Sequence, residues 1–165
     1  PSAGFGLLIE MFDLLPAGKF KLNVCGKVSD YGLALVNDNP NIIVHGFVDA
    51  ASLRRLCENA NILINPRPSY IKLNQMVFPS KLLDYLKYLK PVVTTWTPGL
   101  APDYREVVFA DDTSSAEGLA KQVQNAARLR RGQLEELRKK MVNFVETKTW
   151  ENQALRMRNF LREIK

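Results

Sequence analysis

The chain has few of the residues that build metal sites or disulfide bonds. Its 165 residues include one histidine, His45, and two cysteines, Cys25 and Cys57. Three such side chains are too few for a structural zinc site, which needs four ligands. Both cysteines lie in apolar stretches, which favours buried free thiols in a reducing compartment. We therefore expect no metal, and we expect His45 to be structural rather than a catalytic base.

Long apolar runs and the common nucleotide motifs are also absent. No stretch approaches the roughly 18 apolar residues that a membrane span needs, and the start lacks a signal-peptide pattern. Gly4-Phe5-Gly6 lacks the third glycine and the preceding strand of a dinucleotide fingerprint, and no Walker sequence occurs. No nucleophile elbow accompanies His45. These absences predict a cytoplasmic protein without a dinucleotide, P-loop or hydrolytic site.

The positive charge is unevenly distributed along the chain. The net charge is +6, and residues 1–113 carry 11 basic against 11 acidic side chains, whereas residues 114–165 carry 12 against 6. This basic tail would suit an acidic membrane surface or a lipid-linked acceptor, although a solvated helix face explains it equally simply. Nucleic-acid binding is disfavoured, because no aromatic platform is interleaved with the charges.

The spacing of apolar residues predicts alternating helices and strands. The expected helices are Phe5–Leu15, Tyr31–Asn37, a segment capped by Asp49, and Pro79–Tyr88. The expected strands are Phe20–Cys25, Ile42–His45, Ile62–Ile64, Pro91–Thr95 and Val107–Phe109. Such alternation implies an α/β fold with a Rossmann-like parallel sheet and helices on both faces. The length favours a single domain over residues 1–165.

The remaining segments are predicted to be a loop and a helical tail. Pro66 and Pro68 cannot donate ladder hydrogen bonds, so residues 65–77 should form a loop. Ser114 and Glu117 have the spacing of a capping box at the start of the tail. Two further helices follow, and the last, residues 150–164, has a narrow apolar stripe that must lie against another surface.

The run from Phe78 to Leu86 has the pattern of an anion site at a helix start. Proline suits the first helical position, so with Pro79 there the amides of Ser80, Lys81 and Leu82 should point outward at the positive end of the helix. A lysine so near a helix start opposes the dipole, which suggests that an anion binds beside it. The run therefore predicts a phosphate site, although an ordinary capped helix has the same start.

A carboxylate follows this helix start after one turn. Asp84 lies four residues beyond Ser80 and therefore on roughly the same helix face. A carboxylate there can accept hydrogen bonds from two vicinal hydroxyl groups. Ribose is the candidate that best fits a phosphate and a diol side by side.

Other candidate residues follow the predicted strands, where parallel sheets bind ligands. Gly26-Lys27 and Gly46 would let a ligand approach the backbone, with Phe47 and Val48 as apolar surface for a base; tight turns explain these glycines equally well. Arg67 has a guanidinium suited to phosphate, and an ordinary surface arginine is the alternative.

Together these residues resemble the C-terminal, donor-binding half of a GT-B glycosyltransferase of family 4, the glycosyl transferases group 1. The resemblance covers nearly the whole chain, and its most specific parts are Asn65-Pro66-Arg67-Pro68 and the Phe78–Leu86 run. These two motifs are similar to those of bacterial members that build surface polysaccharides. The resemblance implies retaining transfer from a nucleoside diphosphate sugar to a glycan or lipid-linked acceptor, without a cofactor or metal.

The resemblance implies that Asp84 binds ribose, and the residues themselves suggest the other roles. By hypothesis, Lys81 and Arg67 would stabilise the departing diphosphate in place of the family's usual lysine and arginine. Phe78, Pro79, Ser80 and Leu82 would surround the diphosphate, and Gly26, Lys27, Phe47 and Val48 would border the base. Two positions depart from the family pattern: Met76 stands where a sugar-facing glutamate is usual, and Ala3 where a diphosphate-binding lysine is usual.

The family resemblance further implies that more polypeptide accompanies this segment. The family's domain opens with a central strand, whereas this sequence opens at the following helix. We therefore expect a fragment that lacks this strand and the N-terminal acceptor domain, against which the Trp150 helix would dock. The alternative function is a non-catalytic binding or scaffolding domain, in which Met76 and Ala3 mark lost turnover.

Overall fold

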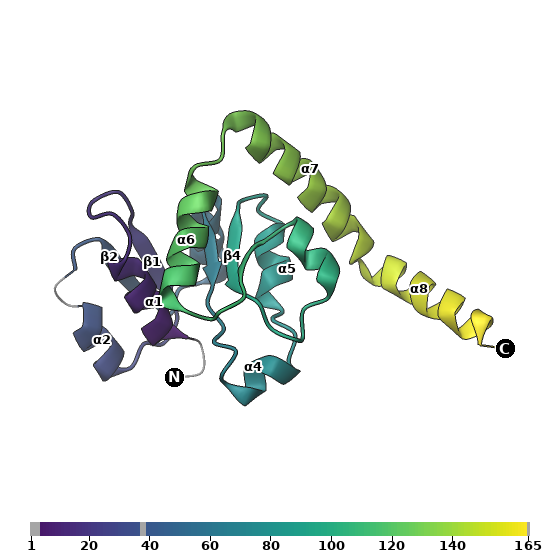
Figure 1. The fold of residues 1–165 in the computed structure, drawn as a ribbon, viewed down its shortest axis with the longest axis horizontal. Coiled ribbons are helices and arrows are strands. Elements are labelled where there is room, and N and C mark those ends of the chain that lie inside the picture. The colour runs from purple at the N-terminus through teal and green to yellow at the C-terminus, as the bar shows by residue number, and fades with distance from the viewer. Residues whose placement is uncertain (1–3, 37–38, 165) are drawn as a thin grey trace.

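The computed structural model describes residues 4–36 and 39–164 as alternating helices and strands (Figure 1). The helices are α1 (Phe5–Asp13), α2 (Asp30–Val36), α3 (Ala50–Asn59), α4 (Lys72–Met76), α5 (Lys81–Leu86), the 3-10 helix η1 (Pro102–Glu106), α6 (Ala116–Ala127), α7 (Arg131–Thr147) and α8 (Trp150–Glu163). The strands are β1 (Leu22–Cys25), β2 (Ile42–Gly46), β3 (Leu63–Asn65), β4 (Val92–Thr95) and β5 (Phe109–Asp111). The expected α/β fold is confirmed; the predicted end of α2, Asn37, and the position Ala3 lie outside the described residues.

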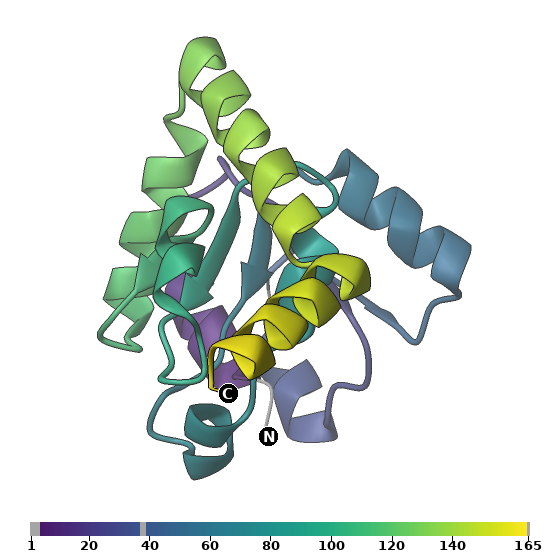
Figure 2. The same cartoon turned by 90° about the vertical axis from the view of Figure 1, so that its right-hand side faces the viewer.

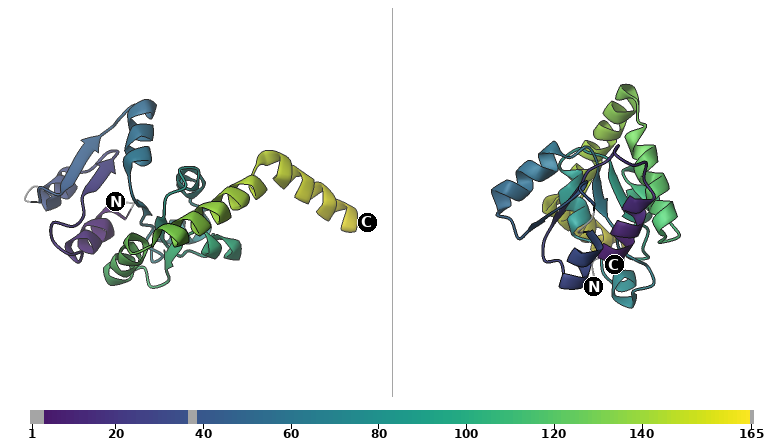
Figure 3. Two further views of the ribbon diagram at one scale, coloured as in Figure 1. Left: turned by 90° about the horizontal axis from the view of Figure 1, so that it is seen from above. Right: turned by 90° about the vertical axis from the view of Figure 1, so that its left-hand side faces the viewer.

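The strands form two parallel sheets rather than one. β1 pairs with β2, and β3, β4 and β5 pair in that order. Figure 3 shows the β1–β2 pair at one end of the molecule, together with α1 and α2. In the part of the chain that the structure describes, no strand pairs with the second edge of β1 or of β3. Each of these strands therefore has one open edge.

Helices cover both faces of the three-stranded sheet. Val93 of β4 packs in one apolar core with α1 and α6, and this core also includes Leu22 and Ile42 of the two-stranded sheet. Val92 packs in a second core with α5, α7 and η1. Adjacent strand residues face opposite sides of a sheet, so β4 joins the two cores. All four β4 residues are buried as a result.

Three predicted boundaries are wrong in the middle of the chain. The predicted 65–77 loop contains the short helix α4, since prolines at 66 and 68 do not prevent a helix from starting at Lys72. α5 begins at Lys81 rather than Pro79, because Pro79 instead closes the preceding turn through its carbonyl, which accepts from the Leu82 amide at 2.9 Å. β5 begins at Phe109, because residues 102–106 form η1 and Val107 and Val108 still bond back to it.

The predicted cap of α6 is also displaced by one residue. Ser115, not Ser114, caps the helix, and its Oγ accepts from the Gly118 amide at 2.9 Å. Ser114 has a positive φ of 53° and turns its hydroxyl to Ser69, at 2.8 Å between the two Oγ atoms. The hydroxyl predicted to cap the helix therefore links it to the loop after β3.

α8 reaches away from the body toward the C-terminus (Figure 1) and lies in front of the body when seen from that end (Figure 2). None of its residues is buried. The predicted stripe is exposed, including Trp150 at 89%. Lys148, between α7 and α8, fixes the root of this helix: its Nζ lies 2.6 Å from Asp103 Oδ2 and 5.2 Å from the centre of the Tyr104 ring. None of the helices in the described ranges combines the length and the apolar character that crossing a membrane requires.

Candidate functional site

A hollow of about 330 Å³ lies where β1 and β2 end. Its lining residues are Gly26, Lys27, Val28, Leu33, Val44, Gly46 and Phe47. Gly26 and Gly46 have φ angles of 117° and 64°, so both turns require backbone conformations that favour glycine. The Gly26 amide donates to the Gly46 carbonyl at 2.7 Å, which holds the two turns together. The structure therefore brings together the two predicted base-binding loops.

The side chains at this hollow differ in character. Phe47 is 84% exposed and lines the hollow, so its ring is accessible to a ligand there. Lys27 is exposed, and Val48, half-buried, is not among the lining residues. The hollow thus offers an aromatic ring, an ammonium group and exposed backbone to a planar ligand.

Arg67 follows β3 and is fixed by β4 and α4. Its amide donates to Thr95 Oγ1 at 2.9 Å, and the Thr95 hydroxyl donates in turn to the Arg67 carbonyl. Its Nη2 donates to Asn74 Oδ1 at 2.8 Å. Asn74 did not stand out in the sequence, because it lay in a predicted loop. Thr94 and Thr95 are polar residues at the end of an apolar strand, which is a usable indication of a functional contact.

Two buried polar atoms at this edge have no hydrogen-bond partner among the described residues. They are Arg67 Nε and Thr97 Oγ1, and they follow the neighbouring strands β3 and β4. A buried donor without an acceptor destabilises a protein, so native structures contain few of them. Both atoms are therefore polar groups that this edge encloses without a partner from the described residues.

The predicted phosphate residues begin α5. Ser80 and Lys81 are exposed, whereas Pro79 is buried. Leu82 is fully buried and its amide is already used by the Pro79 carbonyl, so this residue contributes packing rather than a free donor. Phe78 is half-buried against Tyr104, with ring centres 5.6 Å apart. Of the predicted donors at this helix start, the structure leaves the side chains of Ser80 and Lys81 accessible.

Asp84 lies one turn further along α5. Its Oδ1 accepts from Lys87 Nζ at 2.9 Å, and both side chains are largely exposed. Exposed pairs of this kind contribute at most about 1 kcal/mol, so the carboxylate can exchange Lys87 for another donor. Asp84 therefore remains available to a diol.

Packing contacts connect these loops in part. A Cβ built on Gly99, after β4, would lie 3.2 Å from the Val77 carbonyl oxygen and 3.6 Å from the Phe78 nitrogen. A Cβ on Gly4 would lie 2.5 Å from the Pro66 carbonyl oxygen, so α1 starts directly beside the Arg67 loop. Among the described residues, no hydrogen bond or ion pair joins the hollow at Phe47 to the start of α5.

The two remaining sequence-based candidates behave differently. Met76 ends α4 and is 74% exposed, so this thioether is neither packed nor hydrogen-bonded at the position of the expected glutamate. His45 Nε2 lies 2.9 Å from Asn23 Oδ1, which agrees with a structural histidine. Both cysteines are free, Cys57 buried and Cys25 only half-buried, and burial raises the pKa of each thiol.

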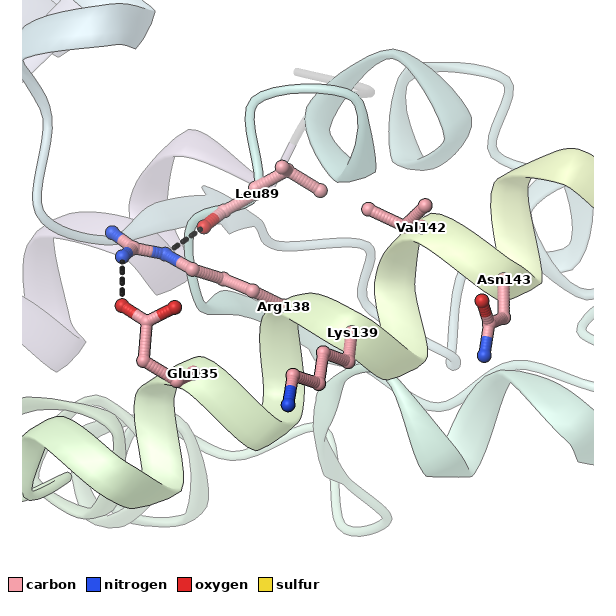
Figure 4. Close-up of a pocket in the computed structure, with 6 residues that line it drawn as sticks. All are labelled: Leu89, Glu135, Arg138, Lys139, Val142 and Asn143. Carbon is pink, nitrogen blue, oxygen red and sulfur yellow. Dashed lines mark hydrogen bonds and ion pairs between the residues drawn. The ribbon is translucent and has the colours of Figure 1, made fainter.

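A second hollow, of about 420 Å³, lies away from these residues (Figure 4). α7 and Leu89 line it, and Arg138 donates from Nε to the Leu89 carbonyl at 3.3 Å and from Nη1 to Glu135 at 2.7 Å. Leu89 precedes β4, so this hollow lies at the amino end of the strand. Ligands of parallel sheets bind at the opposite end, so we assign the site to the carboxyl edge despite the smaller hollow there.

Comparisons with protein families and with solved structures both gave matches. The family model for glycosyl transferases group 1 matches residues 1–128. The structure resembles a glycosyltransferase from Rickettsia africae ESF-5, with a TM-score of 0.70, 17% identity, and coverage of 87% of this chain and 40% of that one. It also resembles WaaG, a glycosyltransferase involved in lipopolysaccharide biosynthesis, with a TM-score of 0.68, 19% identity, and coverage of 89% and 40%. No curated protein gave a significant match.

These likenesses show a GT-B fold, and the chain spans about two fifths of the length of the two solved structures. Within the described residues, no cluster of three or more His, Cys, Asp or Glu side chains could hold a metal ion.

Proposed function

We propose a donor-binding function for this chain from the premise that it belongs to the glycosyl transferases group 1 family. It would bind a nucleoside diphosphate sugar at the carboxyl edge of its sheets, for retaining transfer of the sugar to a glycan or lipid-linked acceptor. The family match over residues 1–128 carries this proposal. The hollow at Phe47 and the accessible Lys81 support it.

In the proposed complex, the donor extends from the β1–β2 hollow to the start of α5. The base stacks on Phe47 beside the Gly26 and Gly46 turns, and Asp84 exchanges Lys87 for the ribose hydroxyls. Lys81 and Arg67 stabilise the negative charge that grows on the departing diphosphate. These two cations supply the neutralisation for which other enzymes use a metal, so no metal is needed.

The transfer reaction needs an acceptor-binding domain in addition to these residues. The two solved structures are more than twice as long as the matched part, which leaves room for such a domain in the longer proteins. The exposed stripe of α8 is the surface for contact with that domain. The basic tail would approach an acidic membrane surface or a lipid-linked acceptor. The open edges of β1 and β3 support one further parallel strand between the two sheets.

Calorimetric titration of the longest natural polypeptide that contains residues 1–165 tests the proposal. UDP, GDP and their sugars are the probes, and we expect one base to bind measurably. Absence of binding by all of them would refute donor binding. Binding without sugar transfer or donor hydrolysis would favour the alternative of a non-catalytic domain, for which the exposed Met76 is the supporting observation.

A further inference from the structure

Asn74 fixes the side chain of Arg67, although nothing in the proposed function yet requires it. Asn74 is 2% exposed, and its Oδ1 accepts from Arg67 Nη2 at 2.8 Å. Its Nδ2 donates to the Pro68 carbonyl at 2.9 Å, so both ends of the amide are used. Because an amide has one acceptor end and one donor end, the Pro68 bond fixes which end faces the arginine.

Thr95 fixes the backbone of the same residue. Its hydroxyl is buried and bonds both the amide and the carbonyl of Arg67. With backbone and guanidinium both held, Arg67 loses little conformational freedom when it binds a ligand, in contrast to a mobile surface arginine. This anchoring separates Arg67 from Lys81, which is exposed at the start of α5.

The anchored guanidinium has an unused donor and an uncompensated charge. Arg67 Nη1 makes no hydrogen bond among the described residues and, unlike Nε, is not among the enclosed polar atoms. Within the same residues, Arg67 takes part in no ion pair, and its side chain bonds to a neutral amide. An anionic oxygen at Nη1 would gain a charge-assisted bond beside a partly desolvated guanidinium. The geometry therefore favours an anionic ligand over a neutral one.

We propose that Asn74 and Thr95 are positioning residues that aim the Nη1 group of Arg67 at an oxygen of the β-phosphate of a nucleoside diphosphate. This inference rests on the proposed function and adds a specific requirement to it. Arginine suits the task because its planar fork keeps one nitrogen on Asn74 while another faces the phosphate. A lysine would keep the charge but could not make both contacts.

The test compares nucleoside mono- and diphosphates in calorimetric titrations of the longest natural polypeptide that contains this chain. The probes are UMP and UDP, and GMP and GDP; the base that binds more tightly is used for the variants. We expect N74A and R67K each to weaken diphosphate binding about tenfold or more, and monophosphate binding less than twofold. The matched control is L73A, which truncates the neighbouring residue of α4, 59% exposed, and should leave both affinities unchanged.

A spectroscopic measurement covers the case in which N74A does not fold. In the wild-type protein labelled with ¹⁵N-arginine, the Arg67 Nη–H resonances are identified by their loss in R67K. We expect those of Nη1 to shift downfield and exchange more slowly with solvent when the diphosphate is added. The monophosphate should leave them in place.

The outcomes separate this inference from the proposed function. If the wild-type protein binds no nucleotide, the proposed function fails. If it binds the diphosphate, but the Nη1 resonances do not move, or N74A weakens mono- and diphosphate equally, the positioning role is overturned and the proposed function stands. A loss confined to the diphosphate supports the role.

Discussion

The two sheets of this chain contribute unlike halves of the candidate site. β4 has a partner on each side and is buried along its whole length, and its end holds Arg67 through Thr95. β1 and β2 form a two-stranded ribbon, and alternate residues such as Asn23 and Ile43 face solvent. The three-stranded sheet, the buried half of the site, holds the Arg67 cation firmly, whereas the two-stranded sheet, the open half, offers glycine turns and an aromatic ring. In the proposed function, the first half binds the phosphate charge and the second contacts the base.

Proline substitution in the two sheets should give the largest difference. In V93P, proline removes a ladder donor from an interior strand. The buried carbonyl left without its partner should cost about 1–3 kcal/mol, and the clash of the ring adds to this loss. The Leu22 amide donates to the Asn41 carbonyl, directly before β2. Successive amides of a strand point to opposite edges, so the Asn23 amide faces the open edge of β1, where proline is tolerated.

Chemical denaturation of residues 1–165 would measure both effects. N23P should stay within about 1 kcal/mol of N23A, the control that removes only the side-chain bond to His45. Equal losses in V93P and N23P would contradict the contrast between the sheets. In a longer polypeptide, a large loss in N23P would instead show that another strand covers this edge.

Loss of the Lys81 ammonium group should strongly reduce diphosphate affinity. A hydrogen bond to a charged group is worth about 1.5–3 kcal/mol, so K81A should weaken binding by about ten- to hundredfold. Lys139, an exposed lysine beside the other hollow, provides the control K139A. Titration calorimetry with the better of UDP and GDP checks this, and a similar loss in both variants would place the anion site elsewhere.

Removal of the Phe47 ring should affect the open half alone. Stacking of a base on an aromatic side chain contributes about 1–3 kcal/mol, so F47A should lower nucleotide affinity about tenfold. The loss should be the same for mono- and diphosphates, because the ring would contact the base. Y70A removes another exposed ring that does not line the hollow, and it serves as the control.

The smallest expected effect is a loss of stability at alkaline pH in the core of the three-stranded sheet, where Tyr104 is buried. Burial raises the pKa of Tyr104 to about 12, above the value of about 10 in an unfolded chain. The native state thus favours the protonated phenol, so this stabilisation is complete below about pH 10 and is lost as the pH rises toward 12. Near-ultraviolet circular dichroism during an alkaline titration should show this loss in the wild type. Y104F, which cannot ionise there, should show a smaller loss, because Tyr85 and Tyr88, whose pKa values are also raised by burial, still ionise.

The sequence predicted the alternation of elements well, because apolar spacing and glycine at strand ends reflect local chemistry. It could not predict α4 or the start of α5, since both depend on how Pro66, Pro68 and Pro79 sit against neighbouring loops. The capping serine was misplaced by one residue for a similar reason: Ser114 bonds to Ser69, 45 positions away.

The candidate site was predictable in part. Glycine turns, Phe47 and Arg67 stand out by residue type and position, and the structure places Gly26, Gly46 and Phe47 around one hollow. Asn74 and Thr95 do not stand out, because their importance comes from contacts with Arg67 across the fold. The Leu82 amide was expected to be free, but the carbonyl of the preceding turn uses it.

The lysine at the root of α8 has a consequence for domain closure. Lys148 lies against Tyr104, and the Tyr104 ring lies against Phe78, which immediately precedes the α5 start. A continuous row of contacts therefore runs from the start of α8 to the residues proposed to hold the diphosphate. In the proposed function, a domain that displaced α8 as it closed would also displace the leaving-group end of the donor site.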